Sequence, residues 1–154
     1  MAGGAGEVSC AAGGDHAVLL KNRGEAVAFG DQFSVGQCDV PALAAGERCV
    51  SCAAGAMHTV LLKNTGEAVA FGDQGDGQCA VPALAAGERY VSCAAGGAHT
   101  VLLKNRGEAV AFGDQFSFGQ CDVPALAAGE RCGSCAAGRR HRGLWEHTGW
   151  AGRS

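Results

Sequence analysis

Apolar residues recur along the chain in short runs that predict strands. The runs VSCAAG, HTVLLK and EAVAFG at residues 50–55, 58–63 and 67–72 are separated by turn-forming residues. Because side chains alternate along a strand, the second and third runs place apolar residues on both faces. A sheet with one face in water would alternate more cleanly. The pattern therefore predicts small sheets that neighbouring sheets cover on both sides.

The same pattern returns at a nearly constant spacing. His16, His58, His99 and His141 are 42, 41 and 42 residues apart, and the first and third copies differ at only four of 42 positions. A period near 41 residues with about four short strands predicts the blades of an all-β propeller. We expect a repeat array over residues 1–138, with repeats at about 10–51, 52–92 and 93–134, a partial fourth at 135–138 and a divergent basic tail at 139–154.

Turn residues separate the expected strands. An N-x-G turn joins the second and third strand of each copy, and its glycine is expected to take a positive φ. These glycines are Gly24, Gly66 and Gly107. A GQCxVP segment then ends in Pro41, Pro82 or Pro124. Because proline cannot donate to a ladder, this segment is expected to form a short outer edge strand or its end.

The full pattern AAGxxHTVLLKNxGEAVAFGDQxxxGQCxVPAL resembles the regulator-of-chromosome-condensation repeat. The matching features are AAG, the following histidine, the turn glycine, the pair Phe71–Gly72 and the pair Gly77–Gln78. The GQxxVP ending is most similar to the variant in the propeller-type β-lactamase inhibitor and in large ubiquitin ligases. The resemblance covers roughly residues 8–138 and implies a propeller that usually closes with about seven blades. Three units predict an incomplete or open propeller.

The pairs CVSC, Cys49–Cys52, and CGSC, Cys132–Cys135, raise the question of a metal or redox site. In the middle copy, however, Tyr90 replaces the first cysteine while the flanking GER and VSC residues stay unchanged. Residues i and i+3 of a regular strand also point to opposite faces. We therefore expect small, buried, apolar cysteines with no metal and no cofactor. A metal- or thiol-dependent enzyme that uses the Cys/His set is the alternative.

The histidines and the loops are the remaining candidate positions. His16, His58 and His99 recur once per blade, which predicts structural imidazoles that bond backbone between blades. The loops after the third strands are the candidate interaction surface, because loops vary at low cost on a rigid scaffold and aromatic residues in them can anchor a partner. The loop positions are Asp31, Gln32, Phe33, Asp73, Gln74, Asp114, Gln115, Phe116 and Phe118.

Composition narrows the protein classes. An apolar fraction of 47% argues against general disorder, and a net charge of −3 gives no reason to expect nucleic acid as a partner. The apolar runs are too short to span a membrane, and no phosphate-binding or serine-nucleophile motif is present. The N-terminus lacks a signal-peptide pattern and nine cysteines is an odd number, so we expect free thiols in the cytoplasm or nucleus.

These observations favour a non-enzymatic protein–protein interaction scaffold, regulatory or substrate-recruiting, whose partner is a protein of unknown identity. The alternative is a fragment of a larger propeller protein, a ubiquitin ligase or a guanine-nucleotide exchange regulator, without activity of its own. Three blades leave apolar faces exposed, which also predicts self-association. Residues 139–154 lose the pattern, and we favour a replaced exon or shifted reading frame over a tail that binds an acidic partner.

Overall fold

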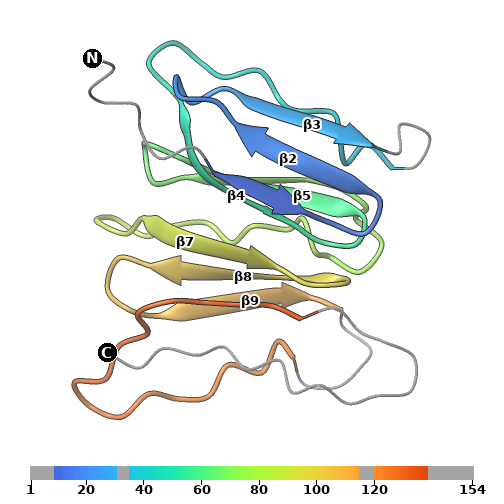
Figure 1. The fold of residues 1–154 in the computed structure, drawn as a ribbon. Coiled ribbons are helices and arrows are strands. Elements are labelled where there is room, and N and C mark those ends of the chain that lie inside the picture. The colour runs from blue at the N-terminus through green and yellow to red at the C-terminus, as the bar shows by residue number, and fades with distance from the viewer. Residues whose placement is uncertain (1–8, 31–34, 115–119, 139–154) are drawn as a thin grey trace.

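The computed structural model describes residues 9–30, 35–114 and 120–138. They form three antiparallel sheets of three strands, stacked side by side (Figure 1). The first sheet holds β1 (Cys10–Ala12), β2 (His16–Leu20) and β3 (Ala26–Gly30); the second holds β4 (Cys49–Ala54), β5 (His58–Lys63) and β6 (Ala68–Gly72); the third holds β7 (Tyr90–Ala95), β8 (His99–Lys104) and β9 (Ala109–Gly113). No helix in this part of the chain is long and apolar enough to cross a membrane.

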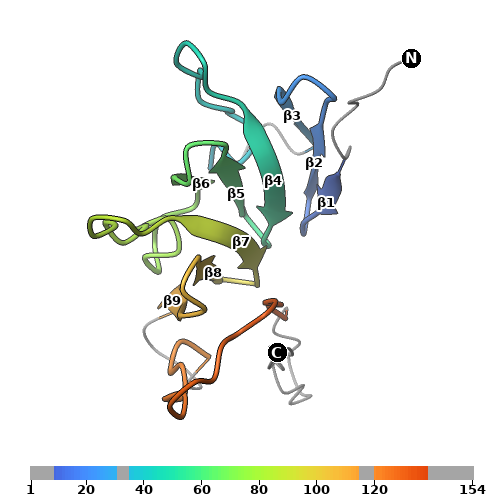
Figure 2. The same ribbon diagram turned by 90° about the vertical axis from the view of Figure 1, so that its left-hand side faces the viewer.

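The three sheets are arranged as propeller blades. Within each sheet the strands follow the chain order, and β4 contacts both β1 and β7. Figure 2 shows the sheets fanning outward from the side where these first strands converge. The small residues of the AAG motif suit that crowded side. The described residues therefore form an open, all-β array of propeller blades, as the repeat predicts.

The predicted fourth strand is not formed in the second blade, where the GQCxVP segment folds into turns instead. Gly77 has a φ of 79°, the Ala80 N–H donates to the Gly77 carbonyl at 3.1 Å, and the Val81 N–H donates to the Cys79 carbonyl at 3.0 Å. Pro82 follows and has no N–H to donate. The prediction was wrong because short-range bonds use the backbone groups that a ladder would need.

The N-x-G turns join the second and third strands of each blade. Gly66 has a φ of 89°, and the Lys63 N–H donates to the Glu67 carbonyl across the turn at 2.9 Å. A Cβ on Gly66 would also lie only 2.3 Å from the Cβ of Arg89, which precedes the next blade. Glycine is therefore required twice, for the left-handed conformation and for the close approach of the neighbouring blade.

The hydrophobic core lies between the blades, in two layers that we call the first and second joint. The first joint, between the first and second blade, is built around Val18, Leu20, Cys49 and Leu61. The second joint, between the second and third blade, is built around Ala53, Val60, Leu62, Tyr90 and Leu102. Leu61 and Leu62 are neighbours in β5 yet face different joints. This explains why the strand carries apolar residues on both sides.

Candidate functional site

Each blade presents two different ends. At the histidine end, the loops that precede the second strands lie beside the loops that follow the third strands. His58 pairs with Gly72 across β5 and β6, and the Asp73 N–H donates to the Met57 carbonyl at 2.9 Å. The N-x-G turns form the opposite, asparagine end. The loops predicted to bind a partner therefore lie together with the glycine–histidine loops.

A hydrogen-bonded relay crosses each joint at the histidine end. His16 Nε2 lies 2.8 Å from Thr59 Oγ1 of the next blade, and that hydroxyl donates to the Gln37 carbonyl at 2.8 Å. Because threonine has a single hydroxyl proton, the imidazole must be the donor of the first bond. His58, Thr100 and Gln78 repeat the relay at the second joint, at 2.9 and 2.7 Å. The imidazole thus reaches the Gln37 or Gln78 carbonyl through a threonine hydroxyl.

The glycine three residues before each histidine is needed to seat the imidazole. A Cβ on Gly55 would lie 2.2 Å from Cε1 of His58 and 2.5 Å from the Gly96 carbonyl oxygen. Burial holds the pKa of His58 at about 4, and burial also lowers the pKa of His16 and His99. The ring is therefore neutral at pH 7 and tied into the scaffold, which suits a structural role better than proton transfer.

The relay is incomplete at both ends of the array. In the first blade Ala17 occupies the position of Thr59 and Thr100. In the third blade the buried Nε2 of His99 has no hydrogen-bond partner among the described residues. The corresponding threonine position in the fourth copy is Arg142, which lies outside the described residues. The two internal joints are therefore complete, and the two outer ones are not.

The cysteine pair at Cys49 and Cys52 faces a single joint. Register shifts between Cys49 and Ser51, so that Cys49 lies opposite Lys63 while Ser51 lies opposite Leu62. Val50 is the extra residue of this bulge, and Cys49 and Cys52 both pack in the first joint. The prediction that the two cysteines point to opposite faces was wrong, because the extra residue of the bulge shifts the alternation of side chains and turns both cysteines toward the first joint.

Burial favours the protonated thiol in six cysteines, whereas Cys10 is exposed. Burial raises the pKa of Cys93 to about 12 and, with the nearby Asp73, the pKa of Cys79 to about 11. Burial also raises the pKa of Cys49 and Cys52. Thiolate is the nucleophilic and metal-binding form. Across residues 9–30, 35–114 and 120–138, no group of three or more Cys, His, Asp or Glu is placed to hold a metal ion.

The predicted interaction loops are only partly described. Asp73 Oδ1 accepts a bond from the Gly75 N–H at 2.9 Å, and the Gln74 carbonyl accepts one from the Gly77 N–H at 3.1 Å. Asp114 Oδ2 accepts from Gln120 Nε2. Both aspartates therefore stabilise their own loops. The other predicted positions, Asp31, Gln32, Phe33, Gln115, Phe116 and Phe118, lie outside the described residues.

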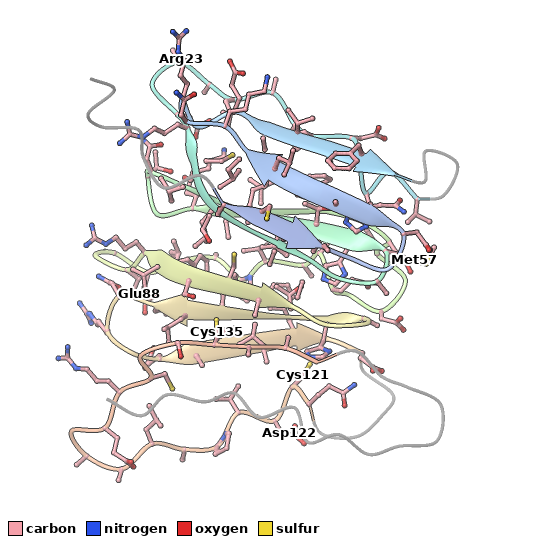
Figure 3. All side chains as sticks on the ribbon, viewed as in Figure 1. Arg23, Met57, Glu88, Cys121, Asp122 and Cys135 are labelled. Carbon is pink, nitrogen blue, oxygen red and sulfur yellow. The ribbon has the colours of Figure 1, made fainter. Side chains whose placement is uncertain are left out.

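Charge is separated between the two ends, a feature that the net charge conceals. Every Lys and Arg of the described residues lies at the asparagine end: Lys21, Arg23, Arg48, Lys63, Arg89, Lys104, Arg106 and Arg131. Five glutamates lie there too and pair with lysines: Glu25, Glu47, Glu67, Glu88 and Glu108. The aspartates of the described residues lie at or beside the histidine end: Asp15, Asp39, Asp73, Asp76, Asp114 and Asp122. Figure 3 shows Arg23 and Glu88 at one end and Met57 and Cys121 toward the other.

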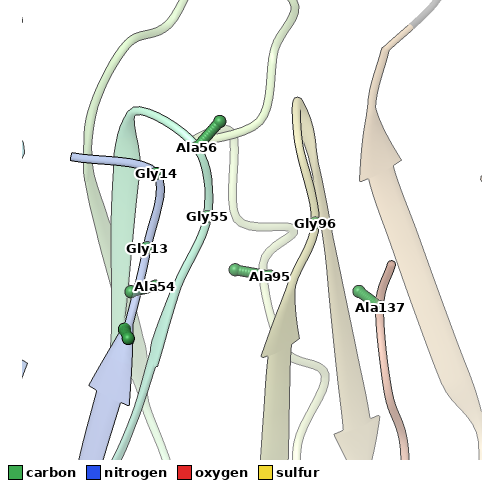
Figure 4. Close-up of a pocket in the computed structure, with 9 residues that line it drawn as sticks. Gly13, Gly14, Ala54, Gly55, Ala56, Ala95, Gly96 and Ala137 are labelled. Atoms are coloured by element: carbon green, nitrogen blue, oxygen red, sulfur yellow. The ribbon is translucent and has the colours of Figure 1, made fainter. Parts of the chain in front are cut away.

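A small pocket opens at the histidine end where the first strands converge (Figure 4). Its lining residues are all glycine or alanine: Ala12, Gly13, Gly14, Ala54, Gly55, Ala56, Ala95, Gly96 and Ala137. Such walls present backbone groups and methyl groups but no ionisable side chain. The pocket therefore supplies no side-chain acid, base or nucleophile. The charged side chains of this end are the aspartates of the surrounding loops.

No protein-family model and no curated protein matches the sequence. Solved structures do match the fold. The ectodomain of the Physcomitrella patens receptor kinase CR4 has a TM-score of 0.63 at 20% identity, covering 84% of this chain and 33% of its own. Prp20p of Saccharomyces cerevisiae has a TM-score of 0.61 at 21% identity, covering 78% of this chain and 35% of its own. A structure of yeast RCC1 (Prp20) bound to Kap60 has a TM-score of 0.59 at 22% identity, and the match covers 73% of this chain and 32% of that protein. This chain thus spans about a third of these proteins, and its fold is that of RCC1-type propeller blades.

Proposed function

We propose that the chain is a non-enzymatic protein-interaction scaffold of the cytoplasm or nucleus, which binds a basic surface of a protein partner through its histidine end. The separation of charge carries this proposal. Aspartates such as Asp15, Asp73 and Asp76 gather at this end, whereas the cations of residues 9–30, 35–114 and 120–138 lie at the other. Complementary charge speeds association and selects partners. The same acidic end repels nucleic acid.

The distribution of sequence differences supports the same end. The relay and the strands HTVLLK and AVAFG are kept almost unchanged in the three copies, whereas the loop reads DQFSVG, DQGDG and DQFSFG. The residues before the histidine also differ: Gly14–Asp15, Ala56–Met57 and Gly97–Ala98. A constant scaffold with variable loops at one end is the usual arrangement of a binding module.

The neighbouring structures add support at a coarser level. One of them is yeast RCC1 (Prp20) bound to Kap60, and Prp20p has binding properties toward Gsp1p and histones. Those partners belong to those proteins. They support the proposal that the ligand of this chain is a protein. We further propose that the scaffold has a regulatory or substrate-recruiting role.

The test is affinity capture with charge-neutralised variants of each end. Asp15→Asn, Asp73→Asn and Asp76→Asn together should remove the proteins captured by the unchanged chain and weaken their dependence on salt. The matched control is Glu25→Gln, Glu67→Gln and Glu108→Gln, which removes three exposed charges from the asparagine end. Equal capture by both variants would refute a binding site at the histidine end. Loss of capture only with the glutamate variant would place the binding site at the asparagine end.

A second candidate is that these blades form part of a larger propeller protein, such as a ubiquitin ligase or a guanine-nucleotide exchange regulator. Its support is that the chain spans about a third of each neighbour and that Leu19 and Phe29 are 43% and 50% exposed. The proposed interaction scaffold also includes self-association through the exposed face that carries Leu19 and Phe29. Comparing the unfolding midpoint of this chain with that of a longer transcript's product tests the second. Equal midpoints would count against it.

A further inference from the structure

The first blade exposes a sheet face that the other blades bury. This sheet lies at one end of the array (Figure 2). Leu19 and Phe29 on its outer face are 43% and 50% exposed, whereas Leu61, the counterpart of Leu19 in the second blade, is 2% exposed. The second blade has a preceding blade to cover this face. In the first blade the same face is open at its largest side chains, which marks it as a contact surface.

The outward positions of this face are all apolar. Because side chains alternate along a strand, every second residue of β1, β2 and β3 points outward. These residues form two rows across the sheet: Cys10, Leu19 and Val27 in one, and Ala12, Ala17 and Phe29 in the other. At the centre of the face, a large leucine therefore lies beside a small alanine.

Opposite charges flank these two rows. Asp15 immediately precedes β2 and Lys21 immediately follows it, and both residues are exposed. By strand alternation they share the face of Ala17 and Leu19, so the outward series along β2 reads Asp, Ala, Leu, Lys. Lys21 Nζ lies 3.3 Å from Glu25 Oε2, but both side chains are more than half exposed. Laid against its own reverse, this series places each charge opposite its counter-charge and each leucine opposite an alanine.

A preceding blade of this repeat fits the face less well. In both internal joints, the histidine of the preceding blade bonds to a threonine on the covered face, as His16 does with Thr59 and His58 with Thr100. In the first blade, Ala17 occupies that threonine position. A preceding blade would bury its imidazole against a methyl group and leave the ring N–H unpaired. The same alanine leaves room for a leucine, which the reversed series supplies.

We infer that two copies of the chain form a dimer in which the outer faces of their first blades pack on each other with antiparallel strands. The two-fold axis crosses β2 between Ala17 and Leu19. Each Leu19 then packs on Ala17 of the second copy, and each Asp15 lies opposite Lys21 of the second copy. Face-to-face packing of sheets and closed two-fold dimers are both common arrangements. This specifies the self-association included in the proposed function and rests on it.

The charges select this direction over the parallel one. With a two-fold axis along the strands, Asp15 would meet Asp15, Lys21 would meet Lys21, and the two leucines would collide. Like charges placed opposite each other disfavour a contact. The contact involves one small sheet from each copy, so the dimer should be weak and should dissociate on dilution.

The first test measures molar mass against concentration by sedimentation velocity of the full chain, 15.4 kDa per copy. We expect a mass that rises with concentration and levels off at two copies, because a two-fold contact is closed. Phe29→Glu and Leu19→Glu should return the protein to the monomer. Val91→Glu is the matched control, because Val91 is 48% exposed but lies in β7 of the third blade.

Circular dichroism confirms that each of these variants is folded. A monomer at every soluble concentration, growth beyond two copies, or a dimer that both glutamate variants leave unchanged would overturn the inference.

The second test determines the direction of packing. Asp15→Lys brings two lysines together at both edges of the contact, and Lys21→Asp brings two aspartates together. Each variant alone should therefore associate about tenfold more weakly. A mixture of the two variants restores opposite charges at both edges and should dimerise more strongly than either variant alone. Single variants that dimerise like the unchanged protein, or a mixture without recovery, would contradict the antiparallel dimer.

The dimer and the proposed partner site can fail separately. Leu19→Glu should abolish the dimer and leave partner capture unchanged. Asp73→Asn combined with Asp76→Asn changes only the second blade, so it should reduce capture and leave the dimer unchanged. A Leu19→Glu variant that loses capture but keeps the dimer would overturn the inference and assign this face to the protein partner.

Discussion

The first and second blades have nearly the same sequence but differ in what surrounds them. Leu19 and Leu61 occupy the same position of the repeat, yet one is 43% exposed and the other 2%. The second blade is covered on both faces, whereas the first is covered on one. In a stacked array, stability therefore resides mainly in the joints between units rather than in the units themselves. Substitutions at equivalent positions can measure how much each joint contributes.

The largest difference is expected between Leu61→Ala and Leu19→Ala. Leu61→Ala removes a buried side chain from the first joint and should lower the free energy of unfolding by about 2–5 kcal/mol. Leu19→Ala removes an exposed side chain and should cost less than about 1 kcal/mol in the monomer. Urea unfolding at a concentration below assembly measures both. Equal losses would mean that the first blade is already covered.

The next effect is a loss of stability in mild acid, which acts on the joints through the buried histidines. The unfolded His58 accepts a proton near its ordinary pKa of 6.5, but burial keeps the folded pKa at about 4. The folded state is therefore favoured fully above pH 6.5, and this contribution is lost as the pH falls toward 4. The loss should be on the order of 3 kcal/mol.

Unfolding by urea from pH 8 to pH 4 measures this loss. His58→Gln keeps a side-chain N–H for Thr100 and has no titrating group, so its stability should depend less on pH over the same range. An unchanged slope in His58→Gln would show that other groups govern the acid response. A flat profile in the unchanged protein would show that the imidazole is accessible to protons in the folded state.

A smaller effect is expected at the relay, where the first two blades differ by a hydroxyl. Thr59→Val keeps the shape of the side chain but leaves the buried Nε2–H of His16 without its acceptor, and should cost about 1–3 kcal/mol. Ala17→Val is the control, because no described residue offers that position a hydrogen bond. The ring protons of His16 in NMR spectra should shift only in Thr59→Val. An equal cost for both variants would assign the effect to packing.

Much of the fold could be predicted because the repeat states the same pattern three times. HTVLLK became β5 over the predicted residues 58–63, and its apolar residues on both faces reflect the two joints. The bulge at Val50 could not be predicted, since one extra residue in a strand leaves no mark in an apolar pattern. The missing fourth strand of the second blade was not predicted either, because the bonds from the Ala80 and Val81 N–H groups to the Gly77 and Cys79 carbonyls form a turn.

The candidate site was predicted less completely. The loops after the third strands were chosen from their position, and their role in binding stays a prediction. The threonine half of the relay was not predicted, because Thr59 reads as an ordinary β-branched strand residue. Its role appears only when the next blade is in place. The separation of charge was visible in the sequence only in part, because the described lysines lie beside the N-x-G turns whereas Arg48, Arg89 and Arg131 reach those turns only through the fold. It was missed because a net charge of −3 describes only the sum.

The smallest effect is expected at the asparagine end, where the first and second blades differ in the burial of a lysine. Lys63 Nζ lies 3.0 Å from Glu47 Oε2, with both side chains 16% exposed, whereas Lys21 and Glu25 are 56% and 65% exposed. A bond from the Ala44 N–H, and then the bond from Lys63, lowers the pKa of Glu47. Because exposed ion pairs contribute little, Lys21→Met should leave the urea midpoint unchanged. Lys63→Met should lower the midpoint, by less than Thr59→Val does.

The difference between Lys63→Met and the unchanged protein should shrink in 1 M sodium chloride, because salt screens the pair. A difference that salt leaves unchanged would mean that the Lys63 stem stabilises the blade by packing, and that charge contributes nothing to the contrast between the two blades.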